Sequence, residues 1–458
     1  MNHLLRLPLT ATVTALLLTA PLLATGYAEE TEKPNPLRFY QGENNSFLQA
    51  SVGLDLAFFN QGNAWFGNDK GNLNGENIDS WWESLVRLGL EGNYTLPNSQ
   101  SFYAMVDAVQ ANTFGGIDIG GTNAAEGDVS SLRFDKAYAG WRSGNLFGTL
   151  GEDFLDISLG RQIYAVGNGF LFTSEGQGGY KRAAWYLGGR KSADFAGIIR
   201  MKSGPWSGDL FYFEADRIND FTAQHFSDFN TRAGGATVDY AFSDSAHLGG
   251  SLFSLDSEDE TRDGMQVYDI RGDIKPFAVA GGPEALQPLK FEAEYAHEDK
   301  DNNLDNGNGW YIATSYRFGK VPWKPELTYR YATFDEDFDS LFYGGTDWGT
   351  WYQGEIVGEY ALGNNNLDTH MIRLKFQPIE SLTVNLFYFT FNLHKPEAYD
   401  VVSDDYADEW NLIFDWAATD YLTLSLVGAY ATPDDGATQL HGGDEDWTSM
   451  MLYGCVRF

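Results

Sequence analysis

The chain has 458 residues, and its 64 Asp and Glu against 30 Lys and Arg give a formal net charge of −34. Such an acidic balance repels polyanions and excludes a nucleic-acid partner. A single cysteine, Cys455, excludes an intramolecular disulfide framework. The mean hydropathy is −0.33 although aromatic residues make up 15% of the chain. This combination is expected where strands alternate lipid-facing with water-facing residues.

The sequence of residues 1–28 indicates a cleaved secretory signal peptide. Arg6 precedes an apolar run that ends near Ala24, and the small residues Gly26 and Ala28 follow it. Pro21 interrupts this run, which is short for a membrane span of ~20 residues. We therefore expect cleavage after Ala28 and one exported domain over residues 29–458, with an uncleaved anchor as the alternative.

Apolar and polar residues alternate with a period of two along several segments, as they do in β-strands. Many of the apolar faces finish in Tyr or Phe, the placement expected of an aromatic girdle at a membrane interface. The clearest segments are 289–296, 311–318, 325–332 and 370–378.

The connecting segments fall into two length classes, as in a closed antiparallel barrel. Short ones carrying Pro, Asn or Gly predict periplasmic turns, and long acidic or Gly-rich ones predict extracellular loops. Sheet edges are not tolerated in lipid, so the strands must close on themselves. The chain length predicts an all-β, up-and-down transmembrane barrel of about 18 strands, with 16 nearly as compatible. The short segments are 95–101, 318–325 and 377–383; the long ones are 60–79, 113–130, 297–309, 335–355 and 436–446.

Segment 381–393 departs from simple alternation. Its first half places Leu382, Val384 and Leu386 on one face, but Phe387 and Phe389 make the other face apolar as well. Either a β-bulge shifts the register, or apolar residues face the inside of the barrel.

The chain ends on a strand-like segment whose last residue is aromatic. Phe458 and Val456 share one apolar face, which suits a closing strand and an outer-membrane assembly signal. The implied partners are the barrel assembly machinery, outer-membrane lipids and lipopolysaccharide.

Two stretches resemble the alginate-export type of outer-membrane barrel: DISLGRQIYAVGNGFLF (156–172) and the aromatic loop followed by a strand pair at 339–392. The resemblance implies an 18-stranded barrel with a substrate-selective, Arg-lined pore, in which Arg161 and Gln162 are the matching positions. Strict alternation puts Arg161 on the same face as Leu159, so an inward Arg161 requires a β-bulge at Gly160.

Charge is distributed unevenly between loops and strands. Acidic residues cluster in the predicted loops at 256–260, 335–339, 434–435 and 444–446, whereas many cations lie within predicted strands. Acidic loops above a basic bore form an anion-selective arrangement. The alternative is that the strand cations only pair with Glu292, Glu294 and Glu326. The predicted pore-lining residues are Arg87, Arg161, Gln162, Arg200, Arg317, Arg330, Arg373 and Lys375.

Other chemical motifs are sparse. DNNLDNGNG (301–309) approaches a calcium loop, but Gly307 falls one place late, so weak calcium binding competes with a solvated loop. His370 lacks any spacing that would assemble a catalytic triad. We expect no cofactor and no enzymatic activity. The aromatic clusters at 184–187 and 348–352 are compatible with sugar stacking or with packing.

The sequence thus predicts a porin-like outer-membrane channel. The leading hypothesis is passive transport of small organic anions or acidic saccharides. Uptake of hydrophobic compounds, such as long-chain fatty acids or alkanes, is the alternative suggested by the aromatic surplus and the second apolar face at 387–393. A barrel enzyme or adhesin is a third possibility.

Overall fold

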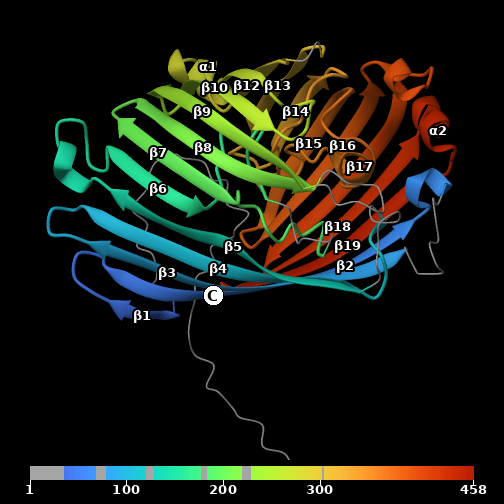
Figure 1. The fold of residues 1–458 in the computed structure, drawn as a ribbon. Helices are drawn as coiled ribbons and strands as arrows, with labels where there is room; N and C mark the ends of the chain where they lie inside the picture. The colour runs from blue at the N-terminus through green and yellow to red at the C-terminus, as the bar shows by residue number, and fades with distance from the viewer. Residues whose placement is uncertain (1–35, 69–78, 120–127, 177–182, 219–227, 302–303) are drawn as a thin grey trace, which may run out of the picture.

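The computed structural model describes residues 36–68, 79–119, 128–176, 183–218, 228–301 and 304–458. Its 18 strands from β2 to β19 each pair antiparallel with their neighbours in the chain, and β19 pairs with β2 to close the barrel (Figure 1). The predicted all-β, up-and-down barrel is confirmed, with 18 strands rather than 16. The predicted signal peptide lies outside the described residues.

The strands are β1 (Arg38–Gln41), β2 (Phe47–Gly62), β3 (Ser80–Thr95), β4 (Ser101–Phe114), β5 (Val129–Arg142), β6 (Leu155–Arg161), β7 (Phe195–Ser203), β8 (Trp206–Ile218), β9 (Asp228–Ser243), β10 (Ala246–Ser257), β11 (Gln266–Ile274), β12 (Lys290–Asp299), β13 (Gly307–Arg317), β14 (Glu326–Phe334), β15 (Leu367–Ile379), β16 (Leu382–Leu393), β17 (Asp405–Ala417), β18 (Leu422–Pro433) and β19 (Trp447–Arg457). Short helical segments lie between them: η1 (Ala64–Gly67), η4 (Gly144–Phe147), α1 (Pro276–Val279), η5 (Glu284–Leu286), η6 (Gly354–Ala361), η7 (Pro396–Tyr399) and α2 (Asp435–His441). Within the described ranges, every helix is too short or too polar to cross a membrane.

Consecutive connections lie at alternate ends of the barrel, as antiparallel pairing of consecutive strands requires, so the predicted short and long connections fall at opposite ends. The predicted short connectors join β3 to β4, β13 to β14 and β15 to β16. The predicted long segments all connect strands at the other end, among them the β2–β3, β4–β5, β12–β13 and β14–β15 connections. We call these the short-turn end and the long-loop end.

The outer face of the wall carries an apolar belt flanked by aromatic rings. Aliphatic side chains such as Leu88, Leu252 and Ile312 are exposed near the middle of their strands. Exposed aromatics lie nearer both strand ends, which is the girdle pattern of a barrel embedded in a lipid bilayer. They include Tyr94, Phe102, Trp206, Phe242 and Trp416 at the short-turn end, and Trp82, Tyr268, Tyr295, Trp410 and Tyr430 toward the long-loop end.

The last residue of the chain takes part in barrel closure. The backbone N–H of Phe458 donates to the carbonyl of Val52 at 2.9 Å, and the N–H of Val52 donates to the carbonyl of Phe458 at 3.1 Å. Val456 pairs with Leu54 in the same ladder, and the Phe458 ring stacks on Tyr421. The predicted closure of the C-terminal strand against the first barrel strand is confirmed. Strand β1 pairs with the part of β2 that precedes this contact.

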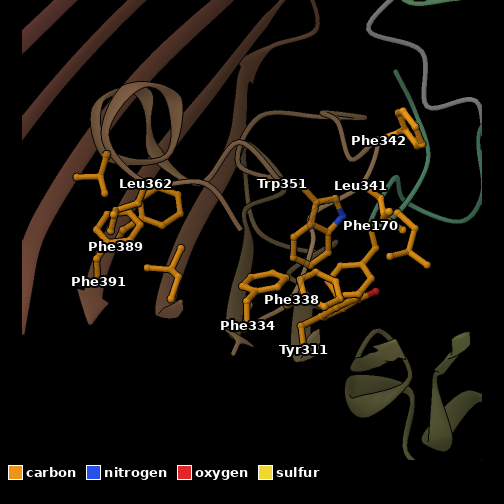
Figure 2. Close-up of a cluster of buried hydrophobic side chains, with 14 of the residues drawn as sticks. Phe170, Tyr311, Phe334, Phe338, Leu341, Phe342, Trp351, Leu362, Phe389 and Phe391 are labelled. Carbon is orange, nitrogen blue, oxygen red and sulfur yellow. The ribbon is translucent and has the colours of Figure 1, made fainter. Parts of the chain in front are cut away.

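The irregular segment 381–393 forms β16 with apolar residues inside the barrel. Its ladder with β17 runs without a shift from Leu382 to Phe391, so no bulge separates its two halves. Phe387, Phe389 and Phe391 are buried, and they belong to one apolar cluster with loop residues inside the barrel. Figure 2 shows Phe389 and Phe391 beside Leu362 of the connection between β14 and β15.

Candidate pore site

Two connections at the long-loop end fold back and pack together in the barrel interior. We call them the β6–β7 loop (162–194) and the β14–β15 loop (335–366). Phe172 and Phe342 form a parallel bridge between them, and the N–H of Gly344 donates to the carbonyl of Gly169 at 3.1 Å. Phe170, Phe338 and Trp351 pack around this contact (Figure 2). The interior therefore has an apolar core of its own, which fixes the position of polar loop groups against the wall.

Buried carboxylates of the wall hold the backbone of both loops. Glu83 on β3 accepts from the N–H groups of Tyr186 at 3.3 Å and Leu187 at 3.0 Å. Glu409 on β17 accepts from those of Ile356 at 3.0 Å and Val357 at 2.8 Å. Because both carboxylates are fully buried, these bonds satisfy loop donors that water does not reach.

Three of the predicted pore cations, Arg330, Arg373 and Lys375, come together on the inner face of β14 and β15. Their positions alternate with the outward-facing Tyr329 and Ile372, so strand geometry points them inward. Asp347, from the β14–β15 loop, accepts from Arg373 at 2.7 Å and from Lys375 at 3.0 Å. Burial opposes ionisation of Asp347, but these two cations outweigh it and lower its pKa.

Arg330 differs from its neighbours because it makes no ion pair with any carboxylate of the described chain. Its side chain is buried, with 6% of the residue exposed, and its guanidinium lies 4.5 Å from the ring centroid of Trp351. Nη2 donates to Oε1 of Gln353 at 3.3 Å, whereas Nε has no hydrogen-bond acceptor. A buried guanidinium with an unused N–H donor can bind an anionic ligand, because its positive charge is permanent and its planar donor groups are held in place.

The wall formed by β9 to β12 carries more carboxylates than cations, in contrast to the region around Arg330. Arg271 on β11 pairs with Asp239 at 2.7 Å and with Asp269 at 2.6 Å. Glu294 lies beside the same pair and is buried. Arg271 is therefore neutralised by the wall itself, and carboxylates outnumber cations there.

Arg87 and Arg200 also face the interior, away from the Arg330 group. Arg87 pairs with Asp107 at 3.0 Å and Asp135 at 2.7 Å, and it donates to the carbonyl of Gly189 at 3.0 Å. It thus holds the β6–β7 loop to the wall. Arg200 lies opposite Asp156 in the β6–β7 ladder.

Arg161, Gln162 and Arg317 do not join this group. Arg161 is the ladder partner of Ala137 and forms an ion pair with Asp194. The expected bulge at Gly160 is absent, because the β5–β6 register is continuous. Gly160 instead has φ 124°, where its missing side chain avoids the carbonyl of Ala137.

Gln162 has a packing role in the wall. Its amide accepts from the hydroxyl of Ser158 at 2.9 Å and donates to the carbonyl of Ala196 at 3.2 Å. Arg317 ends β13 at the short-turn end, where it is exposed.

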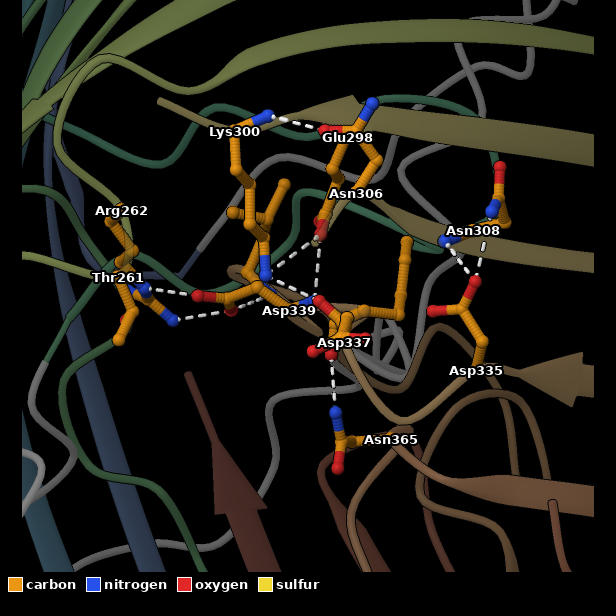
Figure 3. A network of polar contacts seen from close by, with 12 residues as sticks. Thr261, Arg262, Glu298, Lys300, Asn306, Asn308, Asp335, Asp337, Asp339 and Asn365 are labelled. Atoms are coloured by element: carbon orange, nitrogen blue, oxygen red, sulfur yellow. Dashed lines mark hydrogen bonds and ion pairs between the residues drawn. The ribbon is translucent and has the colours of Figure 1, made fainter. Parts of the chain in front are cut away.

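A polar network at the mouth joins three connections at the long-loop end (Figure 3). Arg262 donates from Nη2 to Asp339 at 2.6 Å, Lys300 lies 3.8 Å from Glu298, and the N–H of Asp339 donates to Glu298 at 2.8 Å. This network holds the β14–β15 loop at the mouth.

Part of the predicted calcium loop lies outside the described residues. In the part that is described, Oδ1 of Asn306 accepts from the N–H of Lys300 at 3.0 Å. No described group of three or more His, Cys, Asp or Glu has metal-binding geometry. Calcium binding stays a prediction.

Sequence reasoning missed several residues around Arg330. Asp347, Gln353 and Trp351 reach the site because the β14–β15 loop folds inward, and the aromatic cluster at 348–352 was the available signal. Trp351 is buried in packing, and its indole N–H donates to Asn168 at 3.0 Å.

His370 faces the outside of the barrel, where its Nδ1 lies 2.8 Å from the hydroxyl of Tyr329.

The comparisons with known proteins define the fold. No family model matches the chain, and no curated protein matches it. A BenF-like porin from Pseudomonas fluorescens Pf-5 aligns with a TM-score of 0.57 and 13% identity, over 90% of this chain and 99% of that one. Pseudomonas aeruginosa OprD gives a TM-score of 0.56 at 13% identity, with 90% and 95% covered. OccK5 (OpdH) of the same species gives 0.56 at 10% identity, with 90% and 98% covered. The chain therefore has the 18-stranded barrel fold of these porins.

Proposed function

We propose that the protein is a porin-like channel of the bacterial outer membrane, which passes small organic anions or acidic saccharides by passive transport. The observation that carries the proposal is Arg330, a buried guanidinium that has no carboxylate partner among the described residues and stands beside two further cations. Asp347 is the one acidic side chain recorded in contact with Arg373 and Lys375 among the described residues. The group therefore keeps a net positive charge in the interior.

This charge arrangement favours a solute carboxylate over a cation. Inside the barrel the effective dielectric is lower than in water, so a fixed guanidinium attracts a carboxylate more strongly there. Arg373 and Lys375 lie on the next strand, and they extend the positive region toward the short-turn end. A solute anion would pass from one cation to the next without having to displace a strong ion pair at Arg330.

A planar-bilayer measurement tests the proposal. Arg330→Gln should move the reversal potential in a KCl gradient toward cation preference and should lower the permeability of acetate and galacturonate relative to potassium. Low salt sharpens the effect, because the Debye length reaches ~30 Å at 0.01 M. Arg161→Gln removes the same charge beside Asp194 and serves as the matched control. Equal reversal potentials for the wild type and Arg330→Gln would contradict the assignment.

The proposal also covers the cellular location of the protein and the removal of its signal peptide. Residues 1–28 act as the cleaved signal peptide, and the terminal aromatic Phe458 is read by the barrel assembly machinery. Lipids and lipopolysaccharide contact the apolar belt, with the long-loop end outside the cell and the short-turn end in the periplasm. Cysteine labelling of intact cells in a Cys455→Ser background should modify Val402→Cys, an exposed position at the long-loop end, and not Ser381→Cys. The reverse pattern would invert the orientation.

The resemblance to the alginate-export type of barrel is also part of this proposal. The net charge of −34 disfavours a long polyanion and favours small acids that fit among the inner cations. Hydrophobic uptake is less well supported, because loop residues cover the inner apolar residues Phe387, Phe389 and Phe391. We propose transport without catalysis.

A further inference from the structure

The short-turn end has one connection that differs from the others in charge. The β13–β14 connection (318–325) contains Lys320 and Lys324 and no acidic residue. The other connections between barrel strands at this end, all within the described ranges, are uncharged or acidic, except the β11–β12 connection, where Lys275 is offset by Glu284. In a chain with a formal net charge of −34, the β13–β14 connection is therefore a local surplus of positive charge.

Apolar side chains accompany these two lysines on the outer side of the wall. Phe318, Val321 and Trp323 are exposed, and 59% of Trp323 is accessible. The Trp323 ring stacks on Phe376 with 6.0 Å between the ring centroids. Phe376 lies four residues after the outward-facing Ile372 on β15, so strand alternation places it on the outer face too. Trp323 therefore borders the apolar belt rather than the lumen.

The backbone of this connection is held in an uncommon conformation. Trp323 and Lys324 have φ values of 69° and 45°, in a left-handed region that residues other than glycine rarely adopt. The carbonyl of Trp323 accepts from the N–H of Gln377 at 2.9 Å, and the N–H of Lys324 donates to the carbonyl of Val321 at 3.1 Å. These bonds fix the backbone from which an aromatic ring and an ammonium group extend at neighbouring positions.

Both lysines are available to an external anion. Nζ of Lys320 lies 2.9 Å from Oε1 of Glu284, but the two side chains are 83% and 75% exposed, and an ion pair between such exposed groups contributes little. Lys324 is exposed, and its ammonium makes no ion pair with the described residues. A phosphate group can therefore replace Glu284 at Lys320 and bind Lys324 without breaking a buried contact.

We propose that the surface formed by Phe318, Lys320, Val321, Trp323 and Lys324 binds the headgroup of an anionic phospholipid. Aromatic side chains settle at the boundary between hydrocarbon and headgroups, and lysines beside them reach the phosphate with their ammonium groups. Cations at this depth favour anionic over zwitterionic lipids. In the orientation proposed above, the bound lipid belongs to the inner leaflet, and its binding is independent of the solute in the channel.

Native mass spectrometry of the purified protein tests this surface. After incubation with equal amounts of phosphatidylglycerol and phosphatidylethanolamine, phosphatidylglycerol adducts should be in excess. Lys320→Gln combined with Lys324→Gln should lower this excess by about 5-fold for each lysine removed. Arg232→Gln combined with Lys395→Gln is the matched control, because it removes two cations at the long-loop end whose side chains are 52% and 47% exposed. The control pair should keep the wild-type excess.

Three results would overturn the proposal: a wild type without lipid preference, an unchanged excess in the Lys320→Gln, Lys324→Gln protein, or an equal loss in the control pair. With lipopolysaccharide as a competitor, a loss of lipopolysaccharide adducts alone would overturn it as well, because the surface would then bind that lipid. Trp323→Ala should weaken the binding of both phospholipids and leave their ratio unchanged. The double lysine variant should keep the wild-type reversal potential, so a loss of lipid preference is separable from a loss of anion selectivity at Arg330.

Discussion

Arg330 and Arg271 are both buried arginines on the inner face of the barrel, but their surroundings are opposite. Arg271 pairs with two aspartates at 2.6 and 2.7 Å. Arg330 stacks on Trp351 and donates to one amide. The wall around Arg271 neutralises its cation, whereas no carboxylate of the described residues pairs with Arg330, which is the charge that the proposed anion would meet. An inward-facing arginine therefore suggests an anion-binding site only where no neighbouring carboxylate already neutralises it.

The largest effect expected from this comparison concerns stability. Arg271→Met would leave Asp239 and Asp269 without their cation, which should cost about 3–5 kcal/mol of unfolding free energy. Arg330→Met would lose the Trp351 stacking but would leave none of the described carboxylates without its cation, so about 1–2 kcal/mol is expected. Urea unfolding in lipid vesicles, followed by tryptophan fluorescence, measures both values. Equal losses would show that the two arginines are equivalent structural elements.

The second effect concerns selectivity, and it sharpens the comparison from the acidic side. Asp347→Asn releases Arg373 and Lys375 from their shared carboxylate, so the reversal potential in a KCl gradient should move toward anions. Asp239→Asn removes the same charge near Arg271, where Asp269 remains as a partner. This control should shift the reversal potential less. A larger shift for Asp239→Asn would place the selective region on the β9–β12 wall.

Much of the architecture was predictable because alternation is a local property. Strand position and inward direction followed from the period of two for Arg330, Arg373 and Lys375, and the apolar terminus at Phe458 indicated closure. For Arg161, strict alternation pointed to the face of Leu159, and its ladder partner Ala137 agrees with that register. The bulge suggested by the family resemblance was the part that the structure does not contain.

The rest depends on contacts between distant parts of the chain. Asp239 reaches Arg271 from β9, two strands away around the barrel, and Asp347 reaches Arg373 from within a folded loop. Periodicity within one strand carries no information about either contact. The inner apolar face of β16 was visible in the sequence, but its covering by the loops was not, since that depends on how residues 335–366 fold.

The smallest expected effect is a difference in pH response between two carboxylates of the interior, Asp347 and Glu355. The pKa of Asp347 is lowered by Arg373 and Lys375 against the effect of burial, so its ion pairs are complete above pH ~4 and are lost only as the pH falls further. Glu355 pairs with no cation of the described residues, and burial raises its pKa to about 7. Anion preference should therefore vary little between pH 5 and pH 8, because the ion pairs of Asp347 with Arg373 and Lys375 persist over this range. Reversal potentials recorded at both pH values in the wild type measure this, with Asp347→Asn as the reference for a site without the carboxylate. A preference that rises steeply toward pH 5 would mean that Asp347 is already protonated there, and Arg373 and Lys375 would then lack stable ion pairs with it.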